Sequence, residues 1–336
     1  MIKVNRIRLF NMVLFMKLGF YIKWPLGSLT SKQNVLGDEL IADAMCRSLL
    51  KNSNVCSCEL FAPNHLPDQK LDVMIYLNDT KPNNRWSSKH ILYLQNAYGE
   101  GSDQIINKLH KHGYDGYAFI SERLLQIHKN SGNHGIFLPF GVDTDTFYPR
   151  ETDPEYEFDV AYVGNDIKGE YRTTKYLLPG AKYNMGLFGN WQIPHARVLI
   201  WKNWQRQPKY RKIFERISRG KILQEKVPVL YSNAKINLNC TIQDCVDWDV
   251  ITLRTYEVLA CKGFLISDKT QIAEKTMSEC MVFTEGDDDL SEKIEYYLEH
   301  EKERKKIAQN GYEYVIKNAT IDARMNEFLK YIEDII

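Results

Sequence analysis

Two charged side chains at the start of a short apolar run are the residues best suited to chemistry. Arg254 and Glu257 lie three positions apart, so a helix places both on one face near its amino end. The following Val258–Ala260 can pack against a sheet, and Gly263 is the expected helix stop. A guanidinium can pair with an anion, and a carboxylate can accept hydroxyl hydrogen bonds. The alternative is an ordinary ion pair within the helix.

A second group of polar residues follows a predicted strand that ends at Val163. Gly164 and Asn165 come at the carboxyl end of this strand, where open α/β sheets bind ligands. Gly164 lets the backbone approach a ligand, and Lys168 or Arg172 can reach an anionic group on it. The alternative is a plain turn with solvated side chains. Lys221 is a further basic candidate for a phosphate or base, or another solvated lysine.

Apolar runs of strand and helix type alternate along the whole chain, which indicates parallel sheets covered by helices. The predicted strands are 18–24, 58–61, 73–77, 91–95, 116–120, 135–138, 158–163, 184–188, 234–238, 264–267 and 281–284. The predicted helices include 36–50, 103–112, a helix capped by Ser121, 290–300, 301–315 and 318–336. A length of 336 residues suits two domains.

Charge and cysteine usage exclude several classes of protein. The 44 Lys and Arg residues balance 43 Asp and Glu residues, so no global field attracts nucleic acid. Seven cysteines without a C-x-x-C pair argue against zinc and redox dithiols and favour the reducing cytoplasm.

The residues around Glu257 resemble a family signature. Residues 254–263 resemble the Arg-x-x-Glu-x-Leu-Ala-x-x-Gly pattern of GT-B glycosyltransferases, especially the group-1 and spore-maturation-protein-B-like families. Residues 139–149 resemble the Pro-x-Gly-Val-Asp-x-x-x-Phe-x-Pro linker of the same enzymes, in the expected order. The resemblance implies an α/β protein with two Rossmann-like domains facing across a cleft. We therefore expect an acceptor-side domain at 1–149, a nucleotide-sugar-binding domain at 150–316, and a helix at 317–336 that packs back on the first domain.

The resemblance also implies roles for particular residues. In these families the carboxylate matching Glu257 holds the ribose hydroxyls of a nucleotide-sugar. Asp249 and Glu257 match the Glu-x(7)-Glu spacing of retaining members, with Asp in place of the first Glu, so Asp244 or Asp247 could serve instead. We expect the catalytic residues to be Asp249, Arg254 and Glu257. The expected donor-binding residues, including a first-domain loop that faces the phosphates, are Gly27, Gly164, Asn165, Lys168, Arg172, Lys221, Arg254 and Glu257.

The expected activity is transfer of a sugar, a hexose or a related one, from a nucleotide-diphosphate donor to a hydroxyl of a glycan or lipid-linked acceptor, with retention. That mechanism needs no enzymic base, and none is obvious. The Asp-x-Asp pair at 143–145 belongs to the linker, and the pair at 247–249 has no strand immediately before it, so we expect neither metal nor cofactor. The alternatives are a GT-B nucleotide-sugar epimerase, which needs clustered carboxylates and a His, and a non-catalytic GT-B scaffold subunit.

The amino terminus leaves two interpretations open. Lys3, Arg6, Arg8 and Lys17 interleave with apolar residues, which fits peripheral contact with the inner face of an anionic membrane. The competing interpretation is packed structure that includes the first strand. The uncharged run from Leu9 to Met16 is too short to span a bilayer. We expect a cytoplasmic enzyme of polysaccharide biosynthesis.

Overall fold

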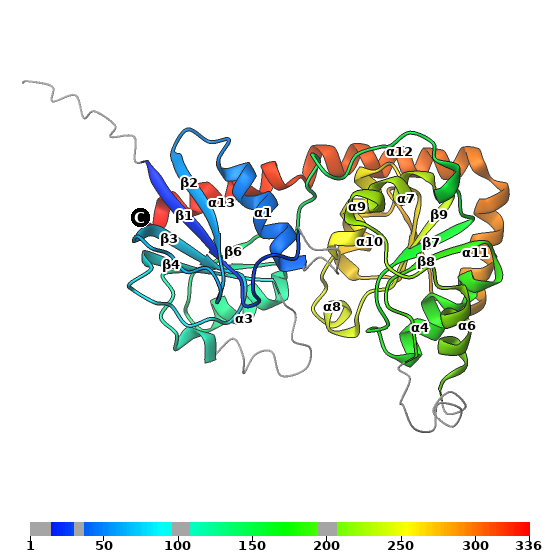
Figure 1. Ribbon diagram of the computed structural model, residues 1–336, viewed down its shortest axis with the longest axis horizontal. Helices are drawn as coiled ribbons and strands as arrows, with labels where there is room; N and C mark the ends of the chain where they lie inside the picture. Colours follow the sequence, from blue (N-terminus) through cyan, green and yellow to red (C-terminus); the bar gives the residue numbers. More distant parts are fainter. Residues whose placement is uncertain (1–14, 30–36, 96–107, 194–206) are drawn as a thin grey trace, which may run out of the picture.

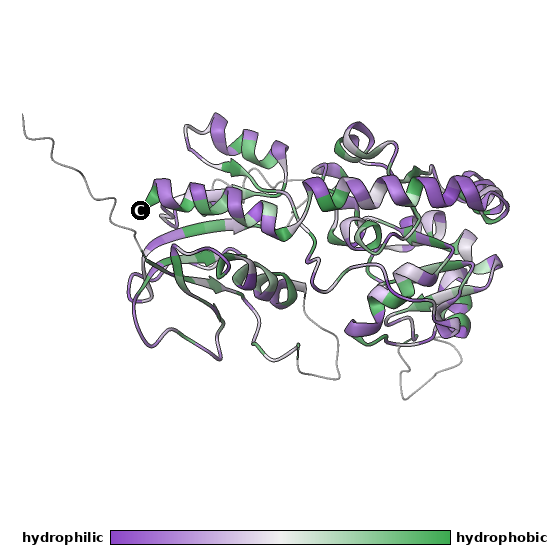
Figure 2. Cartoon of the chain, turned by 90° about the horizontal axis from the view of Figure 1, so that it is seen from above, coloured by the Kyte–Doolittle hydropathy of each residue, from purple (hydrophilic) through white to green (hydrophobic). Residues whose placement is uncertain are grey.

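The computed structural model describes residues 15–29, 37–95, 108–193 and 207–336. These residues form two α/β domains, each with its own parallel sheet, and Figure 1 shows them side by side. Apolar side chains concentrate in the strands, whereas the outer helix α12 is largely hydrophilic (Figure 2). No helix among the described residues has the length and hydropathy needed to cross a membrane.

The first sheet contains six parallel strands in the order β2-β1-β3-β4-β5-β6. Its strands are β1 (Met16–Tyr21), β2 (Val55–Phe61), β3 (Leu71–Tyr76), β4 (Ser87–Leu94), β5 (Gly116–Phe119) and β6 (Ile136–Phe137). The near-continuous burial of β1, β3 and β4 fits strands covered on both faces.

The second sheet contains five parallel strands in the order β11-β10-β9-β7-β8. Its strands are β7 (Val160–Val163), β8 (Met185–Phe188), β9 (Ile236–Asn239), β10 (Leu265–Ser267) and β11 (Val282–Phe283). Every strand predicted from the sequence is therefore confirmed, with shifts only at the ends.

The helices also follow most of the predicted ranges. The α-helices are α1 (Gly37–Leu49), α3 (Glu122–Asn130), α4 (Glu170–Tyr176), α6 (Lys209–Ile217), α7 (Val227–Asn233), α8 (Gln243–Asp247), α9 (Leu253–Ala260), α10 (Gln271–Met277), α11 (Asp287–Glu299), α12 (Glu301–Asn318) and α13 (Ile321–Ile335). The Ser121 side chain accepts from Leu124 N, which confirms the predicted cap. The helix predicted at 103–112 lies partly outside the described residues.

The last helix returns to the first domain, as the sequence predicts. Met325, Phe328 and Ile332 of α13 are buried in the same core as Met45 of α1. The hydroxyl of Ser48 donates to Asp322 Oδ1 at 2.6 Å. Figure 1 shows α12 running over the second domain and α13 continuing beside α1. The boundary predicted at 316 falls inside α12, near the break between the two helices.

The end of α9 differs from the prediction. Lys262, and not Gly263, adopts the left-handed conformation, with φ 56°. A Cβ on Gly263 would lie 2.5 Å from the Tyr231 carbonyl oxygen and 2.8 Å from Asn237 Nδ2. Glycine is therefore required at 263 because α7 and β9 approach closely, and the helix ends one residue earlier.

Lys3, Arg6 and Arg8 lie outside the described part of the chain, so membrane contact by the amino terminus stays a prediction. Lys17 is in β1, where its Nζ donates to Gln69 Oε1 at 3.1 Å. Phe15 is exposed.

Candidate active site

The carboxyl ends of β7 and β8 form a tight pair of turns. The Gly164 N–H donates to the Phe188 carbonyl at 2.9 Å, and the Asn165 side-chain oxygen accepts from Asn190 N at 2.8 Å. A Cβ on Gly164 would lie 2.8 Å from Tyr162 Oη and 3.0 Å from Arg254 Nη2. The sequence places glycine where the guanidinium of Arg254 lies against the turn, as expected for a ligand-binding edge.

Arg254, in the first turn of α9, projects towards this edge of the sheet. Its Nη1 donates to Asn239 Oδ1 at 2.9 Å, and its guanidinium lies 4.8 Å from the ring centroid of Tyr162. Its Nε is buried and has no hydrogen-bond partner among the described residues. The guanidinium is therefore held in place but keeps donors to spare.

Lys168 adds a second positive charge close to Arg254. Burial, followed by the repulsion of Arg254, lowers the pKa of Lys168 to about 8. In the described part of the chain, neither cation forms an ion pair with a carboxylate. Glu257 attracts Arg254 and Asp268 attracts Lys168, but neither carboxylate is ion-paired with these cations, so the pair forms a site for an anion.

Glu257 lies one turn beyond Arg254 on the same helix but faces the first domain. It lines a narrow crevice with Gly37 and Leu40 of α1 and with Leu253. Burial raises its pKa to about 7, although Arg254 opposes the shift. Its carboxylate makes no hydrogen bond or ion pair among the described residues. The structure therefore does not contain the intrahelical ion pair that was the alternative for Arg254 and Glu257.

Asp249 is not placed beside Glu257. Its Oδ1 accepts from Ile272 N at the start of α10 at 2.9 Å, and its backbone has φ 55°. It lines a separate cavity of about 340 Å³ with Arg123, Arg172 and Lys269. The Asp249 carboxylate is thus already hydrogen-bonded to the start of α10. The predicted role of Asp249 at the donor sugar stays a prediction.

The other two carboxylates considered in its place lie on the short helix α8. Asp244 is exposed, and Asp247 accepts from Gln243 Nε2 at 2.7 Å.

Arg172 is held by protein groups on all three nitrogens. Its Nε donates to the Thr241 carbonyl at 2.6 Å, its Nη1 to Gln243 Oε1 at 2.8 Å, and its Nη2 to Asp268 in a buried ion pair. A guanidinium engaged in this way supports the loop that starts at 241, so Arg172 is not proposed as a phosphate ligand.

Two predicted donor-binding residues remain, Gly27 and Lys221. The Gly27 N–H donates to Glu39 Oε1 at 2.9 Å, and the Ser28 N–H donates to Glu39 Oε2 at 2.8 Å. Burial alone would raise the pKa of Glu39, but hydrogen bonds from Ser28 and Gly27 lower it on balance. These amides therefore bind an anion of their own domain. Lys221 is exposed on the loop after Gly220, which accepts from Gly189 N at 2.8 Å.

Comparison with known proteins gives one match to a family model. Residues 178–330 match the family model described as "Glycosyl transferase-like". No curated protein matches the sequence.

Several solved structures share the fold over nearly the whole chain. Sucrose-phosphate synthase from Thermosynechococcus elongatus is 13% identical, with TM-score 0.67, over 95% of this chain and 98% of that chain. Anabaena HepE in complex with UDP and glucose is 10% identical, with TM-score 0.63, over 95% and 100%. T4 phage BGT in complex with UDP-glucose is 15% identical, with TM-score 0.59, over 96% and 99%. The chain therefore has the predicted GT-B fold, and the spore-maturation-protein-B-like subfamily stays an expectation.

Three residues near the site were not predicted from the sequence. Asn239 holds Arg254, Asp268 holds Arg172, and the ring of Tyr162 lies beside the Arg254 guanidinium. Asn239 and Asp268 each come at the end of a strand, next to the predicted ligand-binding edge. Their position at strand ends was the sequence signal that could have identified these two residues.

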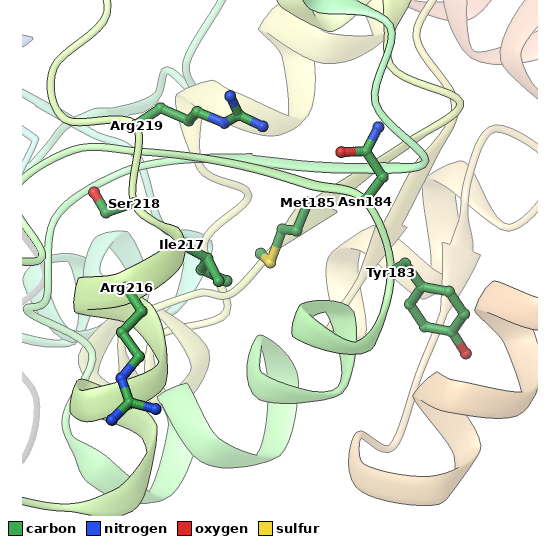
Figure 3. Close-up of a pocket in the computed structure, with 7 residues that line it drawn as sticks. All are labelled: Tyr183, Asn184, Met185, Arg216, Ile217, Ser218 and Arg219. Atoms are coloured by element: carbon green, nitrogen blue, oxygen red, sulfur yellow. The ribbon is translucent and has the colours of Figure 1, made fainter.

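A further cavity, of about 360 Å³, lies at the start of β8 and is away from these residues (Figure 3). Its lining includes Tyr183, Arg216 and Arg219 but none of the predicted site residues. Within the described ranges, no three His, Cys, Asp or Glu side chains are grouped so that they could hold a metal ion.

Proposed function

We propose that this protein transfers a sugar from a nucleotide-diphosphate donor to an acceptor hydroxyl with retention of configuration. One observation carries the proposal: Lys168 and Arg254 lie close together beside Gly164, at the carboxyl edge of the second sheet, and neither forms an ion pair with a carboxylate of the described residues. A diphosphate leaving group supplies the missing negative charge. UDP and UDP-glucose in the structures of similar fold support this class of donor.

The two cations act on the leaving group. Negative charge grows on the diphosphate as its bond to the sugar breaks, and Lys168 and Arg254 stabilise that charge most in the transition state. Glu257 accepts hydrogen bonds from the ribose hydroxyls, which orients the donor. The departing diphosphate takes the proton of the acceptor hydroxyl on the same face of the sugar, so no protein base is needed. We propose that metal is not required, because both cations are side chains.

The donor is proposed to carry a hexose or a related sugar, and the acceptor to be a glycan or a lipid-linked sugar in polysaccharide biosynthesis.

A panel experiment tests the proposal and separates it from the two alternatives. The protein is incubated with UDP-, GDP-, CMP- and dTDP-sugars, and the products are followed by NMR. Slow release of the free sugar and nucleotide from one donor supports a transferase. Conversion of the donor to its epimer supports an epimerase. Binding without any turnover, in the presence of a range of acceptors, supports a scaffold.

A further inference from the structure

A buried chain of polar side chains connects Arg254 to the interior of the second domain. Asn239 ends β9 and is 3% exposed. Its Oδ1 accepts from Arg254 Nη1 at 2.9 Å, while its Nδ2 donates to Ser267 Oγ at 3.0 Å and to Thr241 Oγ1 at 3.2 Å. Both hydroxyls then contact Asp268 Oδ1, at 3.3 Å and 2.9 Å.

The directions of the hydrogen bonds between Arg254 and Asp268 can be assigned in only one way. Asp268 is ion-paired with Arg172 and can only accept, so the protons of both hydroxyls point to it. The hydroxyl lone pairs remain for the amide group of Asn239, which must turn its nitrogen to them. Its oxygen is thereby directed to Arg254. The orientation of Asn239 is fixed by Asp268, two hydrogen bonds away.

The chemical type of Asn239 matters as well as its orientation. An amide oxygen accepts a hydrogen bond from the guanidinium without cancelling its charge. A carboxylate in the same place would form an ion pair with Arg254 and would compete with any anionic ligand. The neutral partner therefore fixes the guanidinium and leaves its charge for the ligand.

We infer that Asn239 is a positioning residue that aims Arg254 at a diphosphate while keeping its charge uncompensated, and that it selects anionic donors. This inference rests on the function proposed above. It assigns a role to a buried amide that contacts no substrate itself.

Calorimetric titration with inorganic pyrophosphate tests the inference without knowledge of the base or sugar. Asn239→Asp keeps the size of the side chain and adds the negative charge. We expect at least a tenfold loss of pyrophosphate affinity and a weaker dependence of the remaining affinity on salt. Thr241→Val, which removes one hydroxyl that orients the amide, is expected to weaken affinity about threefold. This variant keeps the test usable if Asn239→Asp does not fold.

Asn237→Asp is the matched control, because Asn237 is buried two positions earlier on β9 and its Nδ2 donates to Tyr231 O, not to the Arg254 chain. It is expected to lower stability but to leave pyrophosphate affinity within about twofold of wild type. If Asn239→Asp binds pyrophosphate as tightly as wild type, the inference is overturned while the proposed function stands. If Asn239→Asp does not fold, wild-type affinity in a folded Thr241→Val has the same meaning. Equal losses in Asn239→Asp and Asn237→Asp also overturn it, by showing a general effect of buried charge. If the wild-type protein binds neither pyrophosphate nor any nucleotide, both the inference and the proposed function fail.

Discussion

Arg254 and Glu257 lie three residues apart on α9, yet their side chains form no ion pair. Arg254 turns to Asn239 and Tyr162 in its own domain, whereas Glu257 turns to the crevice beside α1. The separation leaves a cation for phosphates and a carboxylate for hydroxyl groups on one short helix.

Replacing Glu257 by Gln is expected to weaken nucleotide binding about 10- to 100-fold, since a hydrogen bond to a charged group contributes roughly 1.5–3 kcal/mol. Calorimetry with the preferred nucleotide measures the effect. Glu292→Gln, at an exposed position on α11, is the control and should bind as wild type does. Unchanged affinity in a folded Glu257→Gln variant would remove the ribose role.

The same variant is expected to be more stable than the wild type at pH 8. Burial raises the folded-state pKa of Glu257 to about 7, above the unfolded value near 4.5. The folded state therefore binds more protons between these values, and stability falls as pH rises through that window. Glutamine removes the cost of the buried charge, on the order of 2 kcal/mol at pH 8 and little at pH 5. Urea unfolding at both pH values decides; an equal difference at both contradicts the assignment.

Lys168 predicts how nucleotide affinity changes in alkaline solution. Burial and Arg254 lower its pKa to about 8, and a bound diphosphate favours its charged form. Affinity for a nucleoside diphosphate should therefore fall about tenfold between pH 7.5 and 9.5. Lys168→Met should bind more weakly and lose this pH dependence, whereas Lys330→Met, at an exposed site on α13, should retain it. A flat profile in the wild type would mean that Lys168 does not contact the phosphates.

The buried His128 is expected to make the first domain less stable in acid. Its Nε2 donates to the His134 carbonyl at 2.9 Å, and its Nδ1 contacts His110 Nε2. Burial lowers the pKa of His128 to about 4. The hydrogen bond to the His134 carbonyl opposes this shift, whereas the charges of His110 and His134 add to it. The unfolded state binds more protons than the folded state between pH 4 and 6.5. The free energy of unfolding that the neutral His128 contributes is therefore lost as pH falls through that window. His128→Gln should reduce the slope of the unfolding free energy against pH between pH 4 and 6.5. An unchanged slope would show that His128 does not cause the acid sensitivity.

The end of α9 can be tested by two substitutions with opposite expected signs. Lys262→Gly should stabilise the protein by about 1 kcal/mol, because a side chain is strained at φ 56°. Gly263→Ala should destabilise it by more, because the added Cβ would lie 2.5 Å from Tyr231 O. Urea unfolding measures both, and a stabilised Gly263→Ala would contradict the close approach.

The strands could be predicted because buried parallel strands are short, apolar runs between turn residues, and each such run in the sequence became a strand. The convergence of Gly164 and Arg254 could also be anticipated, because strand ends and helix starts meet at one edge of such a sheet. Short polar helices such as α8 carry little periodic signal and were missed.

The partners of the charged residues could not be predicted. Arg172 and Lys168 are both basic residues near one turn, but only the packed structure shows that Asp268 pairs with Arg172, whereas Lys168 forms no ion pair among the described residues. Gly27 likewise suits a phosphate loop in the sequence, whereas its amide binds Glu39, 12 residues away. Such choices depend on contacts between distant strands, which spacing in one sequence does not specify.

The most direct test of the account is sugar transfer by the purified protein in EDTA. Each nucleotide-sugar of the panel is mixed with wild-type protein or with Arg254→Ala, and release of the nucleotide is followed by NMR. We predict that wild type consumes one donor in chelator, that the released sugar initially keeps its anomeric configuration, and that Arg254→Ala lowers the rate at least tenfold. If no donor is consumed or bound, or if turnover in EDTA is lost and returns with manganese or magnesium, the account is contradicted.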